Sequence, residues 1–185
     1  MLSLSFTSLL VLGVTFAAAF PQGALKKSCS LSMYQSLVPH EVLKAVQKMQ
    51  DQFEDIMRLS DHKCNTRLFH RKWNTGDLSV PDRVMLVEAE VSLTIAMLEL
   101  PAIPSFAETR QQPLDFLSHV REDLRCWMST EAPLHQPSGR LRHWLQKLQM
   151  AKKTETTGCL EASAINRLFQ VLNDLRCAAL RERCT

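Results

Sequence analysis

The sequence predicts an all-α fold, a bundle of long helices connected up-and-down or through crossovers. The 185-residue chain has only five Gly and one Tyr, far below the turn density and aromatic content of a β-sandwich. Several long segments instead place apolar residues three or four positions apart, the repeat of an amphipathic helix. Six cysteines lie behind an apolar N-terminal segment, so we expect three disulfides formed in an oxidising compartment. The sequence alone leaves their pairing open.

Residues 1–19 are predicted to be a signal peptide. The first twenty residues contain no charged side chain, and three alanines precede Phe20 and Pro21. Small residues at this place favour cleavage after Ala19, which leaves one secreted, extracellular domain over 20–185. The alternative is an uncleaved membrane anchor, because the apolar run is long enough to span a bilayer. No second segment is apolar enough to span a membrane, so we expect no stable membrane insertion of the mature chain.

The first predicted helix follows Pro39 and runs to Leu59. Its apolar stripe consists of Val42, Val46, Met49, Phe53, Ile56 and Met57. Pro39 suits a first helical turn. Val38 is a poor N-cap, however, so a start nearer Ser36 is the alternative. The connection over 60–79 is expected to hold at most a short helical piece.

The second predicted helix occupies 79–100 and is expected to be central. Ser79 is a suitable N-cap, Pro81 suits the first turn, and Pro101 stops the helix. Its β-branched residues are also compatible with a strand. A length of about twenty residues with apolar positions on nearly every side favours a buried helix instead.

Three more amphipathic helices are predicted at 112–128, 138–153 and 158–177. Gly158 and Glu161 are expected to cap the last one, which we predict to be continuous up to Cys177. The loops between the helices are expected to carry Pro101, Pro104, Pro133 and Pro137.

No signature of catalysis or cofactor binding is present, so we predict that the chain is not an enzyme and binds no cofactor or metal. Nucleophile elbows, phosphate-binding glycine loops and paired metal-ligand spacings are all absent from the sequence. Asp61, His62 and Cys64 cluster as possible metal ligands, but in a secreted chain a disulfide at Cys64 is the favoured interpretation. A net charge of +3 is too small to indicate a nucleic-acid partner.

The helix at 138–153 is basic as well as amphipathic. Its cationic residues are Arg140, Arg142, His143, Lys147, Lys152 and Lys153. A solvated face of the bundle is the ordinary interpretation of such a pattern. The alternative is weak contact with a glycosaminoglycan or an anionic membrane.

Four segments, in this order and with these cysteines, resemble the type III interferons (interferon lambda). They are "VEAEVSLTIAMLE", "QPLDFL", "GRLRHWLQKLQ" and "GCLEAS". The resemblance runs from about Cys29 to Cys184, nearly all of the predicted mature chain. It implies an interleukin-10-like helical cytokine bundle of about six helices, conventionally lettered A to F. It also implies the disulfides Cys29–Cys126, Cys64–Cys159 and Cys177–Cys184.

The resemblance implies an antiviral cytokine of innate immunity that binds two class II cytokine receptor ectodomains and activates Janus kinase–STAT signalling. One receptor chain is specific to type III interferons and binds with high affinity, and the other is the shared interleukin-10 receptor β chain. We expect the cytokine to be a monomer. Two alternatives remain open: another interleukin-10-class cytokine, or a basic helical protein that acts on membranes or glycosaminoglycans.

The resemblance implies that the high-affinity site lies on the last helix and on the first helix with the loop that follows it. On the last helix Phe169 lies about 100° round from the core residue Leu168. The resemblance, together with the polar neighbours of Phe169, favours an interface anchor over a packing residue at the edge of the stripe. The predicted contacts of this site are Phe169, Asn166, Gln170, Asn173, Pro39, His40, Leu43, Lys44, Gln47 and His62. Two of them depart from the family pattern. His62 stands where an aromatic residue is expected, and Asn166 stands where some relatives have Phe.

For the shared receptor chain the resemblance implies contacts on the start of the first helix and on the helix at 112–128. We nominate Tyr34, Asp115 and Glu122. A tyrosine before a helix is equally compatible with a packing role.

Overall fold

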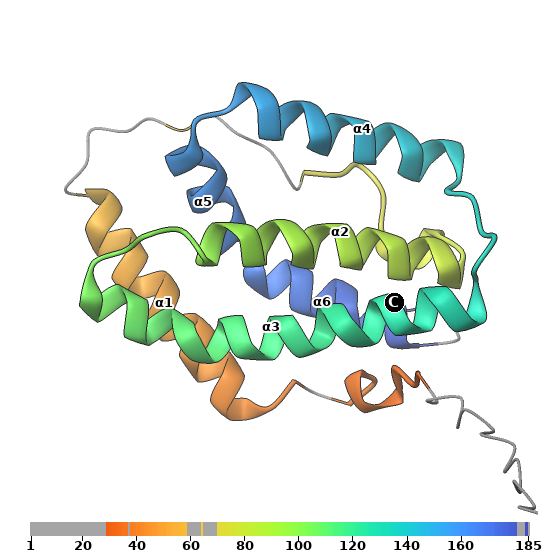
Figure 1. Ribbon diagram of the computed structural model, residues 1–185, viewed down its shortest axis with the longest axis horizontal. Coiled ribbons are helices and arrows are strands. Elements are labelled where there is room, and N and C mark those ends of the chain that lie inside the picture. Colours follow the sequence, from red (N-terminus) through yellow and green to blue (C-terminus); the bar gives the residue numbers. More distant parts are fainter. Residues whose placement is uncertain (1–28, 37, 59–63, 65–69, 181–183, 185) are drawn as a thin grey trace, which may run out of the picture.

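A computed structural model describes residues 29–36, 38–58, 64, 70–180 and 184. Within these residues the chain forms six α-helices and two short 3₁₀ helices and has no β-strand (Figure 1). The all-α prediction is therefore confirmed. The predicted signal peptide at 1–19 and the predicted contact His62 lie outside the described residues.

The first helix, α1, spans His40–Arg58, and the 3₁₀ helix η1 at Ser32–Tyr34 precedes it. Val42, Val46, Met49 and Phe53 are its buried residues, as the apolar stripe predicted. The alternative start near Ser36 is wrong, because the carbonyl of Pro39 accepts the first helical bonds, from the amides of Val42 at 3.0 Å and Leu43 at 3.1 Å. Proline at this position sacrifices no helical hydrogen bond.

The second helix, α2, spans Val80–Leu98 and follows the 3₁₀ helix η2 at Thr75–Asp77. The Ser79 hydroxyl accepts from the amide of Asp82, which confirms the predicted cap. α2 is in contact with α3, α4, α5 and α6 and is the central helix of the bundle. Its buried residues therefore point in every direction, as predicted.

The third helix, α3, spans Pro104–Glu131 and begins well before the predicted residue 112. Pro104 was predicted to lie in a loop but occupies the first turn, where its missing N–H is not needed. Pro113 lies inside the helix and is buried. The turns before Pro113 are held by packing, since the buried Phe106 lies 5.7 Å from Phe53, measured between ring centroids. Tertiary contact therefore continues a helix that the local sequence would end.

The fourth helix, α4, spans Gly139–Thr154 and begins one residue after its predicted start. The predicted last helix is two helices, α5 at Thr157–Asn166 and α6 at Leu168–Ala179. The predicted cap pair is wrong as well, because the Thr156 side chain caps α5 by accepting from the amide of Cys159.

The break between α5 and α6 lies at Arg167, whose φ of −102° and ψ of 3° leave the helical range. The side chain of Gln50 on α1 donates to the carbonyl of Ile165 at 2.7 Å. In a continuous helix this carbonyl would bind the amide four residues further on. The tertiary hydrogen bond from α1 therefore supports the break, which no proline or glycine signals in the sequence.

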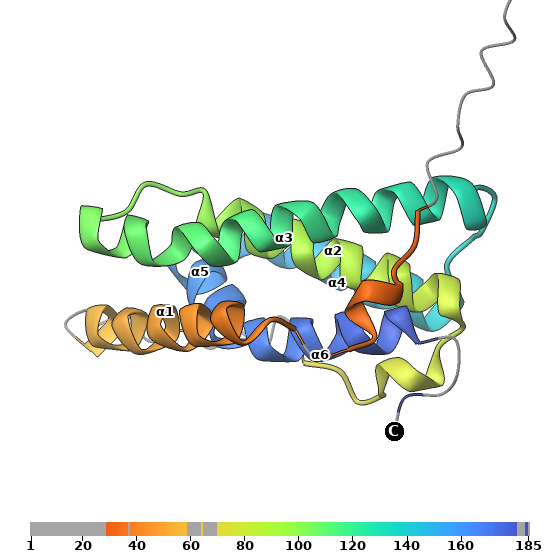
Figure 2. The same ribbon diagram turned by 90° about the horizontal axis from the view of Figure 1, so that it is seen from below.

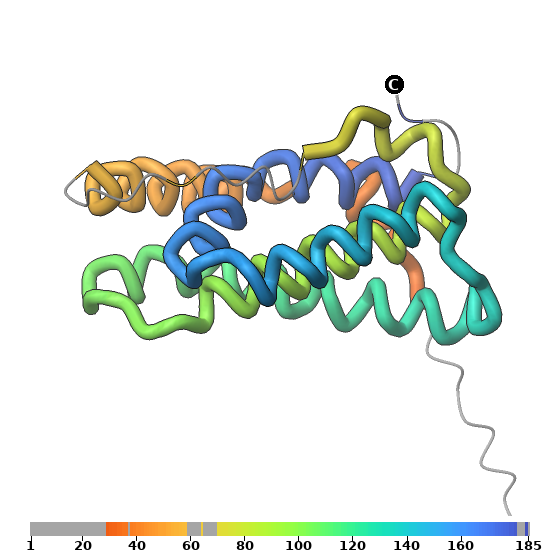
Figure 3. Tube along the Cα trace, turned by 90° about the horizontal axis from the view of Figure 1, so that it is seen from above, coloured from red at the N-terminus to blue at the C-terminus, as the bar shows by residue number. Residues whose placement is uncertain are grey.

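Figures 2 and 3 show α3 on one side of the bundle and α1 with α6 on the other, one after the other along the long axis. α4 lies along the edge beyond α2 (Figure 1). The three cysteine pairs implied by the resemblance, Cys29–Cys126, Cys64–Cys159 and Cys177–Cys184, all form. The second disulfide ties the connection after α1 to the start of α5, and the third closes the C-terminal end of α6 locally.

Candidate functional site

Phe169, the second residue of α6, lies at the edge of the hydrophobic core and is half-buried. Asn166 and Asn173 near it in the chain are exposed, and Gln170 is half-buried. We call these four residues, together with Arg167, the α6 patch. An aromatic residue surrounded by polar ones has the composition of an interface anchor and its rim. Part of the Phe169 ring packs against the core, and the rest of the ring is accessible to a partner.

Arg167 and Arg176 are candidate contacts that the sequence analysis missed. Arg167 is exposed, and its Nη1 donates to Gln170 Oε1 at 3.2 Å. Arg176 is exposed seven residues after Phe169, so it falls near the same face of α6. This spacing and the enrichment of arginine at interfaces were the available signals.

A buried ionic cluster lies behind the C-terminal half of α6. It consists of Arg71, Trp73, Thr75, Glu90, Trp144 and Asp174, and we call it the Arg71 cluster. The Arg71 side chain is 3% exposed; its Nη1 lies 3.1 Å from Glu90 Oε1 and its Nη2 lies 2.5 Å from Asp174 Oδ2. The guanidinium carbon lies 5.0 Å from the ring centroid of Trp73 and 5.8 Å from that of Trp144. Such stacking adds cation–π attraction to the two ion pairs.

Two carboxyl groups share this single arginine. Burial raises the pKa of Glu90 well above its usual value; the positive charge of Arg71 opposes the shift, and the negative charge of Asp174 reinforces it. Asp174 also accepts a short hydrogen bond from the Thr75 hydroxyl. The raised pKa favours the protonated form of Glu90, next to the ion pair between Arg71 and Asp174. The cluster joins η2 and the segment before it to α4 and to the middle of α2 and of α6.

Arg83 of α2 connects η2 to the end of α6. Its guanidinium donates to the carbonyls of Leu78 at 2.9 Å, Gly76 at 3.1 Å and Leu180 at 3.3 Å. Gly76 has no room for a side chain, because a Cβ there would lie 2.5 Å from the carbonyl oxygen of Cys184. Cys184 is thus packed directly on η2. A polar cleft at this end is lined in part by Asn74, Asn173 and Arg176.

The predicted contacts on α1 lie at one end of the helix and on one side of it. His40, Lys44 and Gln47 are exposed and Leu43 is half-buried, at spacings of three and four residues. Pro39 is exposed directly before them. We call these five residues the α1 patch. Gln47 Nε2 donates to Asp51 Oδ1 at 2.7 Å, which orients its amide.

The packing of α1 against α5 determines how the α1 and α6 patches are related. α1 packs against α5 and α3, and its Gln50 binds the end of α5. α6 continues in the same layer beyond that junction (Figure 2). The α1 and α6 patches therefore belong to one layer of the bundle, and a shared interface over both stays a prediction.

Tyr34 of η1 is buried, with 8% of its surface exposed. Its hydroxyl donates to Asp123 Oδ2 at 2.7 Å, and its ring meets Phe116 edge-to-face at 6.3 Å. Burial, the hydrogen bond and the charge of Asp123 all raise the pKa of Tyr34. The tyrosine thus fixes η1 on α3, and its predicted receptor contact stays a prediction.

Asp115 and Glu122, the other two residues nominated for the second receptor, are exposed on α3. A separation of seven residues places them on one face of the helix. Asp115 Oδ1 accepts from Gln111 Nε2 at 2.8 Å, and the exposed His119 lies between the two acids. This face of α3 is therefore polar and available to a partner.

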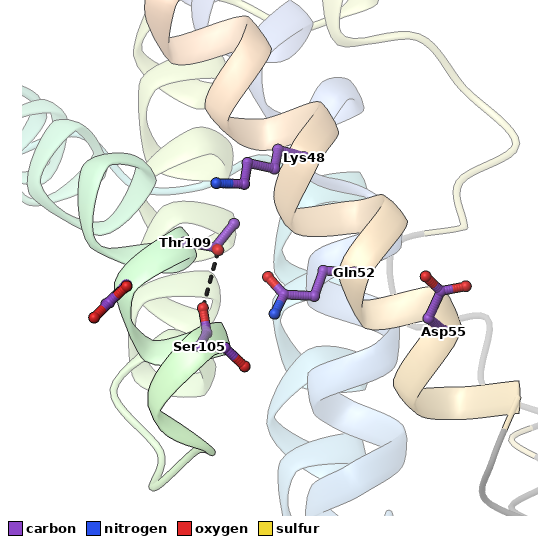
Figure 4. Close-up of a pocket in the computed structure, with 6 residues that line it drawn as sticks. Lys48, Gln52, Asp55, Ser105 and Thr109 are labelled. Atoms are coloured by element: carbon purple, nitrogen blue, oxygen red, sulfur yellow. Dashed lines mark hydrogen bonds between the residues drawn. The ribbon is translucent and has the colours of Figure 1, made fainter.

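A cleft of about 500 Å³ separates the second half of α1 from the start of α3 (Figure 4). It is lined by Lys48, Gln52, Asp55, Ser105, Glu108 and Thr109. Within it the Thr109 hydroxyl donates to the backbone carbonyl of Ser105 at 3.0 Å, a bond internal to α3. The side chains from the two helices do not form a nucleophile–base pair.

The described part of the chain contains no group of three or more His, Cys, Asp and Glu residues able to hold a metal ion. Nor does it contain a helix long and apolar enough to cross a bilayer.

Comparison with known proteins gives a consistent result. A family model described as Interleukin-28A matches residues 26–181. Interferon lambda-3 of Gallus gallus is 66% identical over 174 residues, which cover 94% of this chain and 93% of that protein. Interferon lambda-1 of Homo sapiens is 36% identical over 180 residues, covering 95% and 90%. Interferon lambda-2 of Mus musculus is 37% identical over 161 residues, covering 85% and 83%.

Proposed function

The chain belongs to the interferon lambda family, and from this membership we propose that it acts by bridging two class II cytokine receptor ectodomains. It is a cytokine and not an enzyme. The proposed receptors are the chain specific to type III interferons and the shared interleukin-10 receptor β chain. When the cytokine brings the two receptor chains together, the associated Janus kinases and STAT factors are activated and an antiviral state is induced.

One observation supports the high-affinity half of this proposal: Phe169 is partly exposed on α6, and α6 itself is firmly packed into the bundle. Leu168 and Leu175 are fully buried in the core, and the Arg71 cluster and Arg83 hold the far end. An anchor on a preorganised helix loses little conformational entropy on binding. The α6 and α1 patches together form the proposed surface for the type III-specific chain.

The second half of the proposal assigns the shared receptor chain to α3 and η1. Asp115 and Glu122 present charge on one exposed face of α3. Tyr34 and Phe116 support the neighbouring edge by packing between η1 and α3. A rim of charged residues changes association rate and specificity more than it changes affinity, which suits a lower-affinity site.

The deciding experiment compares Phe169→Ala with Leu168→Ala in binding to the two purified receptor ectodomains. Phe169→Ala should weaken binding of the type III-specific chain by about 2 kcal/mol or more while lowering stability by only about 1 kcal/mol. Leu168→Ala removes a fully buried neighbour, so it should lower stability by about 2–5 kcal/mol. Binding of the shared chain by folded Phe169→Ala should be unchanged.

Normal receptor binding by Phe169→Ala, together with a stability loss as large as that of Leu168→Ala, would make Phe169 a core residue and remove the main support for this surface. STAT phosphorylation in cells that carry both receptor chains tests the pair as a whole. Blocking either chain should abolish the signal, and a signal that needs neither would overturn the bridging proposal.

We also propose that the protein is secreted as a monomer after cleavage following Ala19. The support is the uncharged N-terminal segment and the family membership. Mass spectrometry of the protein from culture medium should find Phe20 as its first residue, and light scattering should give the mass of one chain. Retention of the full chain at the cell membrane would support the anchor instead.

A further inference from the structure

α4 concentrates the positive charge of this protein on one outer helix. It carries five Lys and Arg residues and no acid, against a net charge of +3 for the whole chain; subtracting five from +3 leaves the remainder at −2. All five side chains, Arg140, Arg142, Lys147, Lys152 and Lys153, are exposed. They span thirteen residue steps, or roughly 20 Å of helix. The excess charge is therefore local rather than spread over the surface.

Nothing in the described part of the protein neutralises these cations. None of the five forms an ion pair there, whereas Arg58, Arg71 and Arg125 on other segments all do. Arg142 makes one hydrogen bond, to the carbonyl of Pro137 at 3.2 Å. The five cations, which are distributed around the exposed sides of α4, are accordingly open to an anionic partner.

Two arginines lie where helix electrostatics disfavours them. Arg140 and Arg142 are in the first turn of α4, beside the positive end of the helix dipole, and this turn holds no acid. α1 and α2 carry Glu41 and Asp82 at the same place. The first turn of α4 is thus intrinsically less stable than theirs, and binding of an anion there would relieve the repulsion.

A basic amphipathic helix can bind either an anionic membrane or a glycosaminoglycan, and the tertiary structure distinguishes between these two partners. A helix that lies on a membrane inserts its apolar face into the lipid. The apolar face of α4, formed by Leu141, Trp144 and Leu148, is instead buried against the bundle. Met150 is its one large exposed apolar residue, at 58% exposure. The helix therefore offers charge without an insertable face, which suits an anionic polymer in solution better than a lipid surface.

We propose that the outer face of α4 binds a sulfated glycosaminoglycan. A linear polyanion can run along the helix and meet several cations in succession, and the exposed Gln146 and Gln149 can add hydrogen bonds. α4 lies along the edge of the bundle beyond α2, away from α1 (Figure 1). The polysaccharide and the proposed receptor chains therefore use different surfaces, and this inference does not depend on the receptor assignment.

The test is retention on immobilised heparin and titration with heparin, using the full mature chain. The triple variant Arg142→Gln, Lys147→Gln, Lys153→Gln should weaken heparin binding by about tenfold or more and elute at lower salt. The matched control is Lys48→Gln, Arg58→Gln, Lys72→Gln, which removes the same charge from other exposed positions. It should keep most of the affinity, and both variants should keep the helical circular dichroism spectrum.

Several results would overturn the proposal. Equal losses in the two variants would show that net charge, not α4, is responsible. Release of the unmodified protein from heparin below about 0.15 M salt would leave no binding at physiological ionic strength. Binding to phosphatidylserine vesicles but not to heparin would identify a membrane instead. Unchanged binding to fully desulfated heparin would show that sulfate groups are not recognised.

Discussion

The two predicted receptor surfaces are built in different ways. The α6 patch lies on a helix that the Arg71 cluster and Arg83 connect to the rest of the bundle, and the Cys177–Cys184 disulfide closes its C-terminal end locally. The second surface, formed by Asp115 and Glu122 of α3, depends at its edge on η1, a segment of three residues. η1 is held by the Tyr34–Asp123 hydrogen bond, the Cys29–Cys126 disulfide and a bond from Gln35 Nε2 to the carbonyl of Ala179 at 2.9 Å.

The difference teaches how one small bundle can support contacts of unequal strength. A contact that relies on one buried aromatic anchor gains from a rigid support, because little ordering opposes binding. A contact through exposed acidic residues and a short attached segment gains less binding free energy, because exposed charges contribute more to association rate and specificity than to affinity. Three substitutions, with effects from largest to smallest, test whether the two supports really differ.

Removing Arg71, the cation at the centre of the cluster that supports α6, should have the largest effect on stability. Arg71→Ala leaves two carboxyl groups buried without their partner and should lower the free energy of unfolding by about 3–5 kcal/mol. Arg58→Ala is the control, since Arg58 is exposed and pairs with Glu54 and Asp55 at 3.6 and 3.9 Å; it should change stability by less than about 0.5 kcal/mol. Denaturant unfolding measures both, and similar small values would show that the cluster does not support α6.

Glu90, the buried glutamic acid of the Arg71 cluster, should make the stability of the protein depend on pH. Because its pKa is raised, Glu90 keeps a proton in the folded protein that the unfolded chain releases. The contribution of this proton to the free energy of unfolding is fully present below the ordinary glutamate pKa of 4.5, and it is lost as pH rises toward the raised pKa of Glu90. Glu90→Gln should remove that fall, so its free energy of unfolding should change less between about pH 5 and pH 8 than that of the unmodified protein.

Unfolding measured across this pH range checks the prediction, with Glu54→Gln as an exposed control that should leave the slope unchanged. An identical slope in Glu90→Gln and the unmodified protein would mean that Glu90 does not hold its proton in the folded state.

The smallest effect is expected on the η1 side. Tyr34→Phe keeps the edge-to-face contact with Phe116 but removes the hydrogen bond to Asp123, so it should lower stability by about 1 kcal/mol. Binding of the shared receptor chain should weaken while that of the type III-specific chain is unchanged. Thermal unfolding and the two ectodomain titrations measure these effects. Equal weakening of both chains would contradict two separately supported surfaces.

Much of the fold could be predicted because helix period and capping are local properties. The stripe on α1, the Ser79 cap and the all-round burial of α2 are all confirmed. The early start of α3 was missed because Pro113 suggests a helix start, whereas packing of Phe106 carries the helix through it. The disulfide pairing was predicted only from the family resemblance, because spacing alone leaves it open.

The candidate site was less predictable. Phe169 was found because an aromatic residue off the apolar stripe is visible in the sequence. Arg71 was not, because an arginine in a connecting segment looks like an exposed one until the fold brings Glu90 and Asp174 beside it. Tyr34 was identified as a notable residue, but its buried position against Asp123 depends on a contact eighty-nine residues away.

By itself the sequence determined where most of the helical segments lie and which face of each is apolar, because both depend on neighbours three or four positions away. Only the tertiary structure decided where the last helix breaks and which charges lie inside. The bond from Gln50 to Ile165 and the ion pairs of Arg71 join residues far apart in the chain. The same holds for α4, because its basic pattern is local but the burial of its apolar side is set by its packing on α2.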